Sequence, residues 1–234
     1  MDDKRKTVYA LSVLLGDVVW THPVDNRVIW DVTNKEGGVQ APGVESAGAK
    51  HSNFSENDRE ADYHTDASFA AVPDRYFLLY SVQAAECGGG QTFLTDARRL
   101  TEELLRTEQG RAAIEILEKT SFPMRVPKAF RSRAEVGSDG HSWTPIIANG
   151  SMWRFRKDKI DNGLAKYPEL ATPQVRAAVA TAYRRLHSRQ DEYRAVTPTD
   201  AVLIVDNHVT LHGRTAFTDF RRHLLRARFD KSAT

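Results

Sequence analysis

Residues 63–69 of this chain read YHTDASF and carry the first signal of its fold and chemistry. Side chains of an extended strand alternate between its two faces, so His64 and Asp66 are expected on one face and Thr65 on the other. A neutral imidazole beside a carboxylate supplies two of the three protein ligands of a two-His, one-carboxylate iron site. With 8 His and 31 acidic residues in 234, about one such tripeptide arises by chance, so the motif requires a second His downstream.

That second His is expected within residues 201–214, which read AVLIVDNHVTLHGR. A buried strand, a polar turn and a return strand would bring His212 into the interior, beside the first motif. Two other histidines compete for the role. His208 directly follows the turn and is expected near the rim, and His223 follows the last turn of the chain.

Four motifs then occur in a particular order, namely HTD at 64–66, GGQT at 89–92, DN-x4-HGR at 206–214 and R-x3-R at 222–226. Together they resemble the Fe(II)/2-oxoglutarate oxygenases of the taurine dioxygenase (TauD/TfdA) superfamily. The HGR-x2-F piece at 212–217 is similar to the clavaminate synthase-like branch, which includes amino-acid β-hydroxylases. The resemblance covers roughly residues 60–95 and 200–229.

The resemblance implies three iron ligands, His64, Asp66 and His212. Arg222 would hold the distal carboxylate of the co-substrate 2-oxoglutarate, with Thr92 hydrogen-bonding the same group, and O2 would be the other co-substrate. Arg226 would face the anionic end of the primary substrate. The carboxylate ligand argues against a halogenase, because halogenases of this type have a small residue there.

Physical chemistry supports the arginine assignments independently. A dicarboxylate needs a fixed, bidentate cation at one end, and the planar fork of Arg provides it. Arg222 and Arg226 share one face of the expected last strand, and two cations on a buried face are costly unless anions meet them. A solvated edge formed by all the arginines of residues 221–228 is the alternative. The spacing from His212 also leaves open whether Arg221 or Arg222 is the anchor.

The pattern of strands and helices favours one domain, 1–234, mainly β with inserted helices (α+β), around a double-stranded β-helix (jelly roll) core. Residues 33–62 and 131–142 are candidate lid loops. Because His64 comes early, this is either a compact member, or N-terminal strands are missing or supplied by a partner chain. Strands are expected at 18–20, 27–32, 75–83, 122–130, 201–205, 209–212 and 223–229, a hairpin at 145–155, and helices at 4–15, 96–104, 108–119 and 173–193.

Composition narrows the classes of partner. The formal net charge is +2, and no basic arm or stripe indicates nucleic acid or a membrane surface. Cys87 is the only cysteine, which excludes a disulfide framework and a Cys-based zinc site. The N-terminus lacks the features of a signal peptide, so a cytoplasmic protein is expected. A small-molecule substrate is the expected partner, and a homo-oligomer is left open.

The expected function is therefore a dioxygenase that hydroxylates, or otherwise oxidises, an unactivated C–H bond of a small amino-acid-like or carboxylate substrate, with succinate and CO2 as co-products. Desaturation and cyclisation stay open. Arg154 and Arg156 alternate on the expected strand at 152–155 and are candidates for the cavity mouth, and the acidic loop 53–62 is a candidate clamp for a cationic group. The alternatives are a metal-binding jelly roll of non-oxygenase chemistry, such as a zinc isomerase or hydrolase, and a non-catalytic binding protein.

Overall fold

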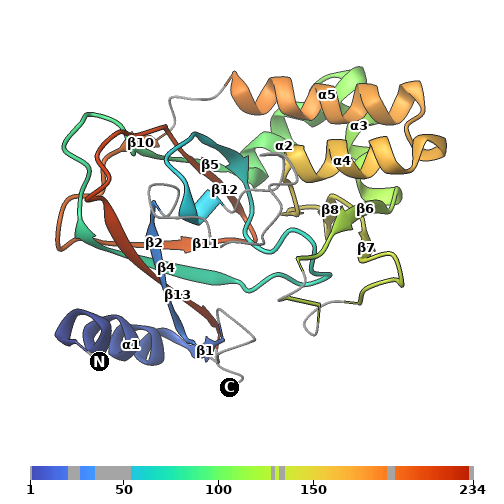
Figure 1. Ribbon diagram of the computed structural model, residues 1–234. Helices are drawn as coiled ribbons and strands as arrows, with labels where there is room; N and C mark the ends of the chain where they lie inside the picture. Colours follow the sequence, from blue (N-terminus) through green and yellow to red (C-terminus); the bar gives the residue numbers. More distant parts are fainter. Residues whose placement is uncertain are drawn as a thin grey trace, which may run out of the picture.

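A computed structural model describes residues 2–20, 27–34, 54–127, 130–131, 135–188 and 193–231. Its centre is formed by two antiparallel sheets (Figure 1). The five-stranded sheet contains β1 (Asp17–Val19), β2 (Ile29–Thr33), β4 (Tyr76–Gln83), β11 (Val202–Asp206) and β13 (His223–Asp230). The four-stranded sheet has the order β10-β5-β12-β3, with bounds Tyr193–Ala195, Thr92–Asp96, Thr210–Arg214 and Ala61–His64.

Side chains from the two sheets meet in the interior. The rings of Phe77 on β4 and His212 on β12 have centroids 4.7 Å apart. Residues of β13 alternate, so that Leu225 and Ala227 pack under α1 (Asp3–Leu15) together with Val8, and the intervening side chains point toward the second sheet. The jelly roll predicted from the sequence is confirmed by this arrangement.

Four helices gather on the other side of the molecule from α1 (Figure 1). They are α2 (Ala97–Leu105), α3 (Glu108–Lys119), α4 (Lys157–Lys166) and α5 (Pro173–His187). Side chains cap three of them, because Asp96, Thr107 and Thr172 each accept a hydrogen bond from a backbone N–H of the first turn. Leu117 and Leu186 are completely buried, and each such side chain contributes about 1.5–3 kcal/mol relative to exposure.

Two short hairpins complete the fold, β6 (Phe122–Arg125) with β7 (His141–Thr144) and β8 (Ile147–Ala148) with β9 (Met152–Trp153). Asn149 and Gly150 both have positive φ at the β8–β9 turn, which confirms the predicted hairpin. The short 3-10 helices η1 (Phe54–Glu56) and η3 (Pro168–Leu170) lie in the connections. No helix among the described residues has the length and apolar character needed to cross a membrane.

Two sequence-based boundaries need correction, and one helix was not expected. The strand predicted at 122–130 ends at Arg125, and the helix predicted at 173–193 ends at His187, since Tyr193 already belongs to β10. The sequence analysis did not predict α4, because Ile160 and Leu164 alone give little helical periodicity. Of the candidate lid loops, residues 35–53 and 132–134 lie outside the described part of the chain.

Candidate metal centre and co-substrate pocket

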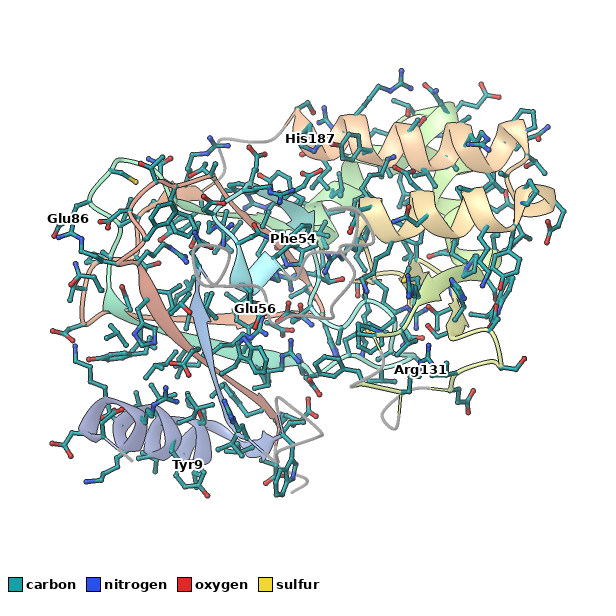
Figure 2. All side chains as sticks on the ribbon, viewed as in Figure 1. Tyr9, Phe54, Glu56, Glu86, Arg131 and His187 are labelled. Carbon is teal, nitrogen blue, oxygen red and sulfur yellow. The ribbon has the colours of Figure 1, made fainter. Side chains whose placement is uncertain are left out.

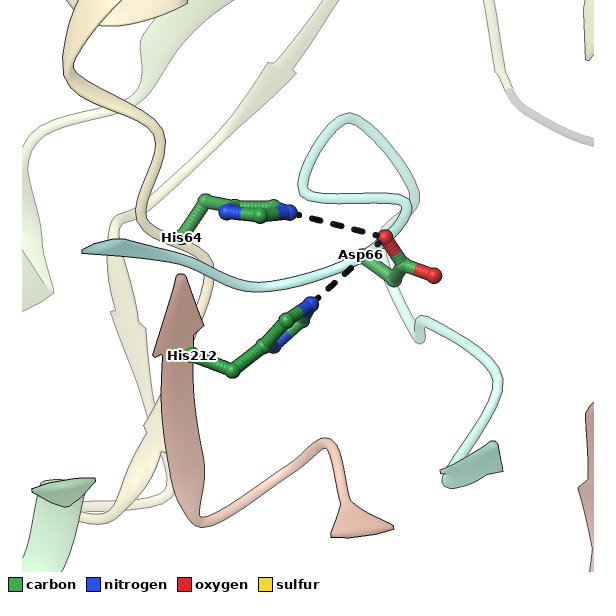
Figure 3. Close-up of side chains that lie close together, drawn as sticks. All are labelled: His64, Asp66 and His212. Atoms are coloured by element: carbon green, nitrogen blue, oxygen red, sulfur yellow. Dashed lines mark ion pairs between the residues drawn. The ribbon is translucent and has the colours of Figure 1, made fainter. Parts of the chain in front are cut away.

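Three potential metal ligands converge between the sheets. His64 ends β3 and lies directly opposite His212 of β12 in the antiparallel register, and Asp66 follows two residues after His64. The Nε2 atoms of His64 and His212 lie 3.8 and 3.9 Å from Oδ1 of Asp66, as Figure 3 shows. One ligand atom from each residue lies within 4.8 Å of the others, a spacing that a single ion can bridge.

The protonation states of these groups suit a metal. Nδ1 of His64 lies 2.8 Å from the carbonyl oxygen of Asp62, so this nitrogen donates and Nε2 keeps its lone pair. Burial lowers the pKa of His64 to about 4, although the Asp66 charge opposes it. Burial, followed by the nearby His64, holds the pKa of His212 well below its usual value. Both rings are therefore neutral at pH 7.

The second carboxylate oxygen of Asp66 is held by two arginines. Burial alone would raise the pKa of this carboxyl, but Arg226 and Arg228 hold it well below its usual value. Nη1 of Arg226 and Nη2 of Arg228 donate to Oδ2 at 3.0 and 2.8 Å. Oδ1 is thereby left to face the two imidazoles. Arg228 was not predicted from the sequence as a site residue. The available signal was its position two residues after Arg226, which places both side chains on the same face of the strand.

Asn207 is a second residue that the sequence analysis did not assign to the site. Its Oδ1 accepts from the backbone N–H of Asp66 at 2.8 Å, and its Nδ2 donates to the carbonyl oxygens of Asp66 and Asp74 at 3.1 and 3.0 Å. The Asn207 side chain is 1% exposed. It fixes the backbone that carries Asp66, and so it acts as a positioning residue.

Arg222 lies buried next to this centre. Its Nη1 has no hydrogen-bond partner among the described residues, and its guanidinium lies over the Phe217 ring at 5.1 Å. Burial, then the neighbouring Arg214 charge, lowers the pKa of Arg222 to about 9. Thr92 lines the same small cavity, of about 70 Å³, which also reaches the three potential ligands. Arg221, by contrast, is exposed and paired with Asp219 and Glu86.

A larger cavity of about 430 Å³ is lined by two of the potential ligands, His64 and Asp66. Arg226 borders both cavities, and Arg156 lines the larger one. Arg154 does not line either of them. Its guanidinium donates to the carbonyl oxygens of Pro145 and Ala71, so this predicted mouth residue is instead part of the protein interior.

The remaining candidates lie elsewhere. Nε2 of His208 is 2.7 Å from the carbonyl oxygen of Pro73, and Nε2 of His223 is 2.7 Å from Oδ1 of Asp31. Neither belongs to the three-residue cluster. Of the rivals for the third ligand position, only His212 reaches the centre.

The acidic loop before the first motif does not form the expected clamp. Buried Arg214 donates to the carbonyl oxygens of Phe54, Asn57 and Arg59 and ties the described end of the loop to β12. Asp62 is engaged by Tyr183 and His187. Figure 2 shows Phe54 and Glu56 at the middle of the molecule, but of the described residues 54–62 of this loop only Phe54 and Ser55 line the larger cavity.

The donor set therefore fits an iron ion. Two neutral imidazoles and one carboxylate leave coordination positions open for a co-substrate and O2. A guanidinium without a partner in a small side cavity is suited to a carboxylate that enters beside the metal. The observation that carries this fit is the unpartnered Nη1 of Arg222.

Comparisons with known proteins give a family match and similar folds. A family model described as "Taurine catabolism dioxygenase TauD, TfdA family" matches residues 14–228. The 3-((Z)-2-isocyanoethenyl)-1H-indole synthase of Fischerella ambigua (strain UTEX 1903) is 24% identical over 172 residues, which are 70% of this chain and 61% of that protein.

Solved structures share the fold. Asparagine oxygenase in complex with Fe(II), 2S,3S-3-hydroxyasparagine and succinate superposes with a TM-score of 0.63 at 21% identity, over 96% of this chain and 63% of that one. The non-heme iron oxygenase OrfP in complex with Fe and alpha-ketoglutaric acid gives a TM-score of 0.64 at 15% identity, over 98% and 65%. The chain thus spans less than two thirds of the length of these relatives. The clavaminate synthase-like branch stays a prediction.

Proposed function

Because the chain belongs to the taurine catabolism dioxygenase TauD, TfdA family, we propose that it is an Fe(II)- and 2-oxoglutarate-dependent dioxygenase. Its reaction is the hydroxylation, or a related oxidation, of an unactivated C–H bond in a small amino-acid-like acid, with succinate and CO2 as co-products. The proposal places this reaction in the cytoplasm. The single observation that carries it is the buried Nη1 of Arg222, which has no hydrogen-bond partner among the described residues, beside a two-His, one-carboxylate cluster.

His64, Asp66 and His212 would hold the iron through the nitrogen and oxygen atoms that face one another. Iron bound there supplies O2 activation coupled to the oxidative decarboxylation of 2-oxoglutarate. The chain keeps both rings neutral by burial and keeps Asp66 ionised through Arg226 and Arg228. The ligands are therefore ready to bind without a proton having to leave first.

Arg222 would bind the distal carboxylate of 2-oxoglutarate, with Thr92 as a second hydrogen-bonding group in the same cavity. The cost of burying an unpaired guanidinium is offset when the carboxylate arrives. Gly90 provides room, because a Cβ at that position would lie 3.1 Å from Cδ and Nε of Arg222.

Arg226 would bind the acidic end of the primary substrate. It lines the larger cavity, and its Nε has no hydrogen-bond partner among the described residues while Nη1 binds Asp66. A substrate carboxylate bound at Nε of Arg226 would lie close to Asp66, which the same guanidinium binds through Nη1. The reacting carbon would therefore be held near the iron.

The proposal is tested by supplying Fe(II), ascorbate and 2-oxoglutarate and measuring succinate, followed by a screen of amino acids for products heavier by one oxygen. We expect succinate from the unaltered protein and a rise of at least tenfold in the KM for 2-oxoglutarate in Arg222→Gln, since a charge-assisted pair contributes about 1.5–3 kcal/mol. Arg221→Gln is the matched control, because this exposed neighbour lies outside both cavities.

Two results would contradict the proposal. Unchanged succinate production in Arg222→Gln would exclude this arginine as the co-substrate anchor. The absence of 2-oxoglutarate turnover in a folded protein that binds divalent metal would favour the zinc isomerase or hydrolase alternative, and the absence of both would favour a binding protein.

A further inference from the structure

The larger cavity has an unusual balance of charge. Six cationic side chains line it but only two carboxylates, within the part of the chain that the structure describes. One of the carboxylates, Asp66, is already bound by Arg226 and Arg228. The other, Asp158, is bound by Arg156 through two hydrogen bonds of 2.9 and 3.1 Å. No carboxylate of the lining is left to receive a cationic substrate group.

Three of the six cations have no acidic partner among the described residues. They are Arg125, Arg131 and Lys159. Nζ of Lys159 donates to the carbonyl oxygen of Arg125 at 3.1 Å and lies 5.4 Å from the centre of the Phe69 ring. Burial, then the charges of Arg156 and Arg125, depress the pKa of Lys159 to about 8, although Asp158 opposes the shift. Arg125 and Arg131 are exposed, and the repulsion that Lys159 experiences from Arg125 and Arg156 is relieved when an anion enters.

Two polar features of the same cavity point to a ligand. The hydroxyl of Ser68 is 1% exposed, lines the cavity and has no hydrogen-bond partner in the described structure. The first turn of α4, which contains Lys159, begins at the cavity, and its N-cap residue Arg156 makes no side-chain cap. The N-terminus of a ten-residue helix adds positive potential at this place.

The cations continue outward beyond the cavity. A neighbouring cavity of about 340 Å³ shares Arg125, Arg131 and Asn162 with the first. It adds Lys166, His141 and one carboxylate, Asp139, which is paired with Lys166 at 3.7 Å. Arg131, labelled in Figure 2, belongs to both cavities. The positive lining thus runs from Arg226, beside the potential iron ligands, to the outer surface.

We propose that the primary substrate carries a second oxyanion, a carboxylate or a phosphate, and that Lys159 binds this group together with Arg125 and Arg131. This inference rests on the proposed function and adds the substrate class. Arg226 holds one acidic end of the substrate, and the second acidic group lies toward the outer cavity. A diacidic or phosphorylated amino acid is therefore accepted, and its amide, alcohol or cationic counterpart is disfavoured.

The test compares matched pairs of ligands by calorimetric titration without oxygen. The pairs are L-aspartate with L-asparagine, L-glutamate with L-glutamine, and O-phospho-L-serine with L-serine, and L-arginine is the cationic probe. Each is titrated into the protein loaded with Fe(II) and 2-oxoglutarate and into the protein without them. The two carboxylate pairs and the phosphate pair separate the two possible sources of the oxyanion.

We expect at least one acidic member to bind at least tenfold more tightly than its neutral partner. Lys159→Gln should remove most of this preference, and Lys159→Arg should retain it. Lys157→Gln is the matched control, because Lys157 lies in the same helical turn, pairs with Asp161 and does not line the cavity. Circular dichroism confirms that each variant is folded.

Equal binding of the two members in every pair, including no binding at all, would overturn the inference, and so would a preference for L-arginine. A preference that survives in Lys159→Gln would overturn the role of this lysine. Failure of the proposed function is recognised separately, because it is read from succinate formation in the absence of a primary substrate.

Discussion

Replacing Asn207 by Ala tests how the metal centre is held. The substitution removes three hydrogen bonds, one from the N–H of Asp66 and two to the carbonyl oxygens of Asp66 and Asp74, at a side chain that is 1% exposed. At about 1 kcal/mol for each hydrogen bond, the free energy of unfolding should fall by about 3 kcal/mol. For a chain of this size, that loss corresponds to a decrease in Tm of roughly 6–12 °C.

The same substitution should weaken metal binding, because the backbone that positions Asp66 loses its support. Loss of an outer partner of a metal ligand typically costs about 10–100-fold in affinity. Thermal unfolding of the metal-free protein measures the first effect, and titration with Mn(II) under anaerobic conditions measures the second. Asn207→Asp keeps the oxygen that accepts from the Asp66 N–H, but its second oxygen faces the carbonyl oxygens of Asp66 and Asp74. If the Asp66 N–H contact dominates, the metal affinity of Asn207→Asp should lie between that of Asn207→Ala and that of the unaltered protein.

The reasoning is refuted if Asn207→Ala keeps a Tm within about 2 °C of the unaltered protein and binds Mn(II) equally well. Such a result would mean that the two sheets alone fix the position of Asp66. A lower Tm with unchanged metal affinity would show that Asn207 stabilises the fold without positioning the ligand.

Three further predictions concern the metal, the strand that carries His212 and the cavity lysine. Mn(II) at about 100 times its Kd should raise the Tm by roughly 5–10 °C in thermal unfolding, because binding then adds about 2.7 kcal/mol, and His212→Ala should abolish this rise. Gly213→Ala should lower the Tm more than Gly150→Ala does. A Cβ at Gly213 would lie 2.0 Å from Cε2 of Phe93 and 2.6 Å from the Ala61 carbonyl oxygen, whereas Gly150→Ala costs only the backbone strain of its positive φ, because a Cβ there meets nothing within 4 Å. The reverse order would contradict the packing of β12. In calorimetric titrations, the affinity for the acidic ligand should fall as pH rises through about 8, because the Lys159 ammonium then loses its proton. Lys159→Arg should show no such fall, and equal pH profiles would exclude Lys159 as the group responsible.

The sequence was sufficient for features that depend on local pattern. The alternation around His64 and Asp66, the strand–turn–strand containing His212 and the helices α2 and α3 each follow from neighbouring residues. The order of the motifs along the chain then supplied the family, and with it the expectation that these residues meet.

Features that depend on contacts across the fold could not be obtained in this way. Arg228 binds Asp66, which lies 162 positions away in the sequence. The alternation of the strand predicts which face of the sheet Arg228 occupies but not which residue it binds. Alternation along a strand was misleading for Arg154. It does not distinguish a side chain that lines a cavity from one that is buried and donates to backbone carbonyl oxygens, as Arg154 does. In α4, Gly163 lowers the helical propensity, yet a Cβ there would lie 2.0 Å from the Pro123 carbonyl oxygen, so the close approach of β6 requires it.

The two sheets contribute different residues to the proposed site. Both histidines belong to the four-stranded sheet, while Arg226 and Arg228 extend from β13 of the five-stranded one. The proposed metal ligands His64 and His212 and the proposed substrate-binding Arg226 thus extend from separate sheets, and Asp66 is hydrogen-bonded to both Arg226 and Arg228. Substitutions on β13 and at the start of α4 should therefore change which substrate binds without removing either histidine, provided that Asp66 keeps a positively charged neighbour.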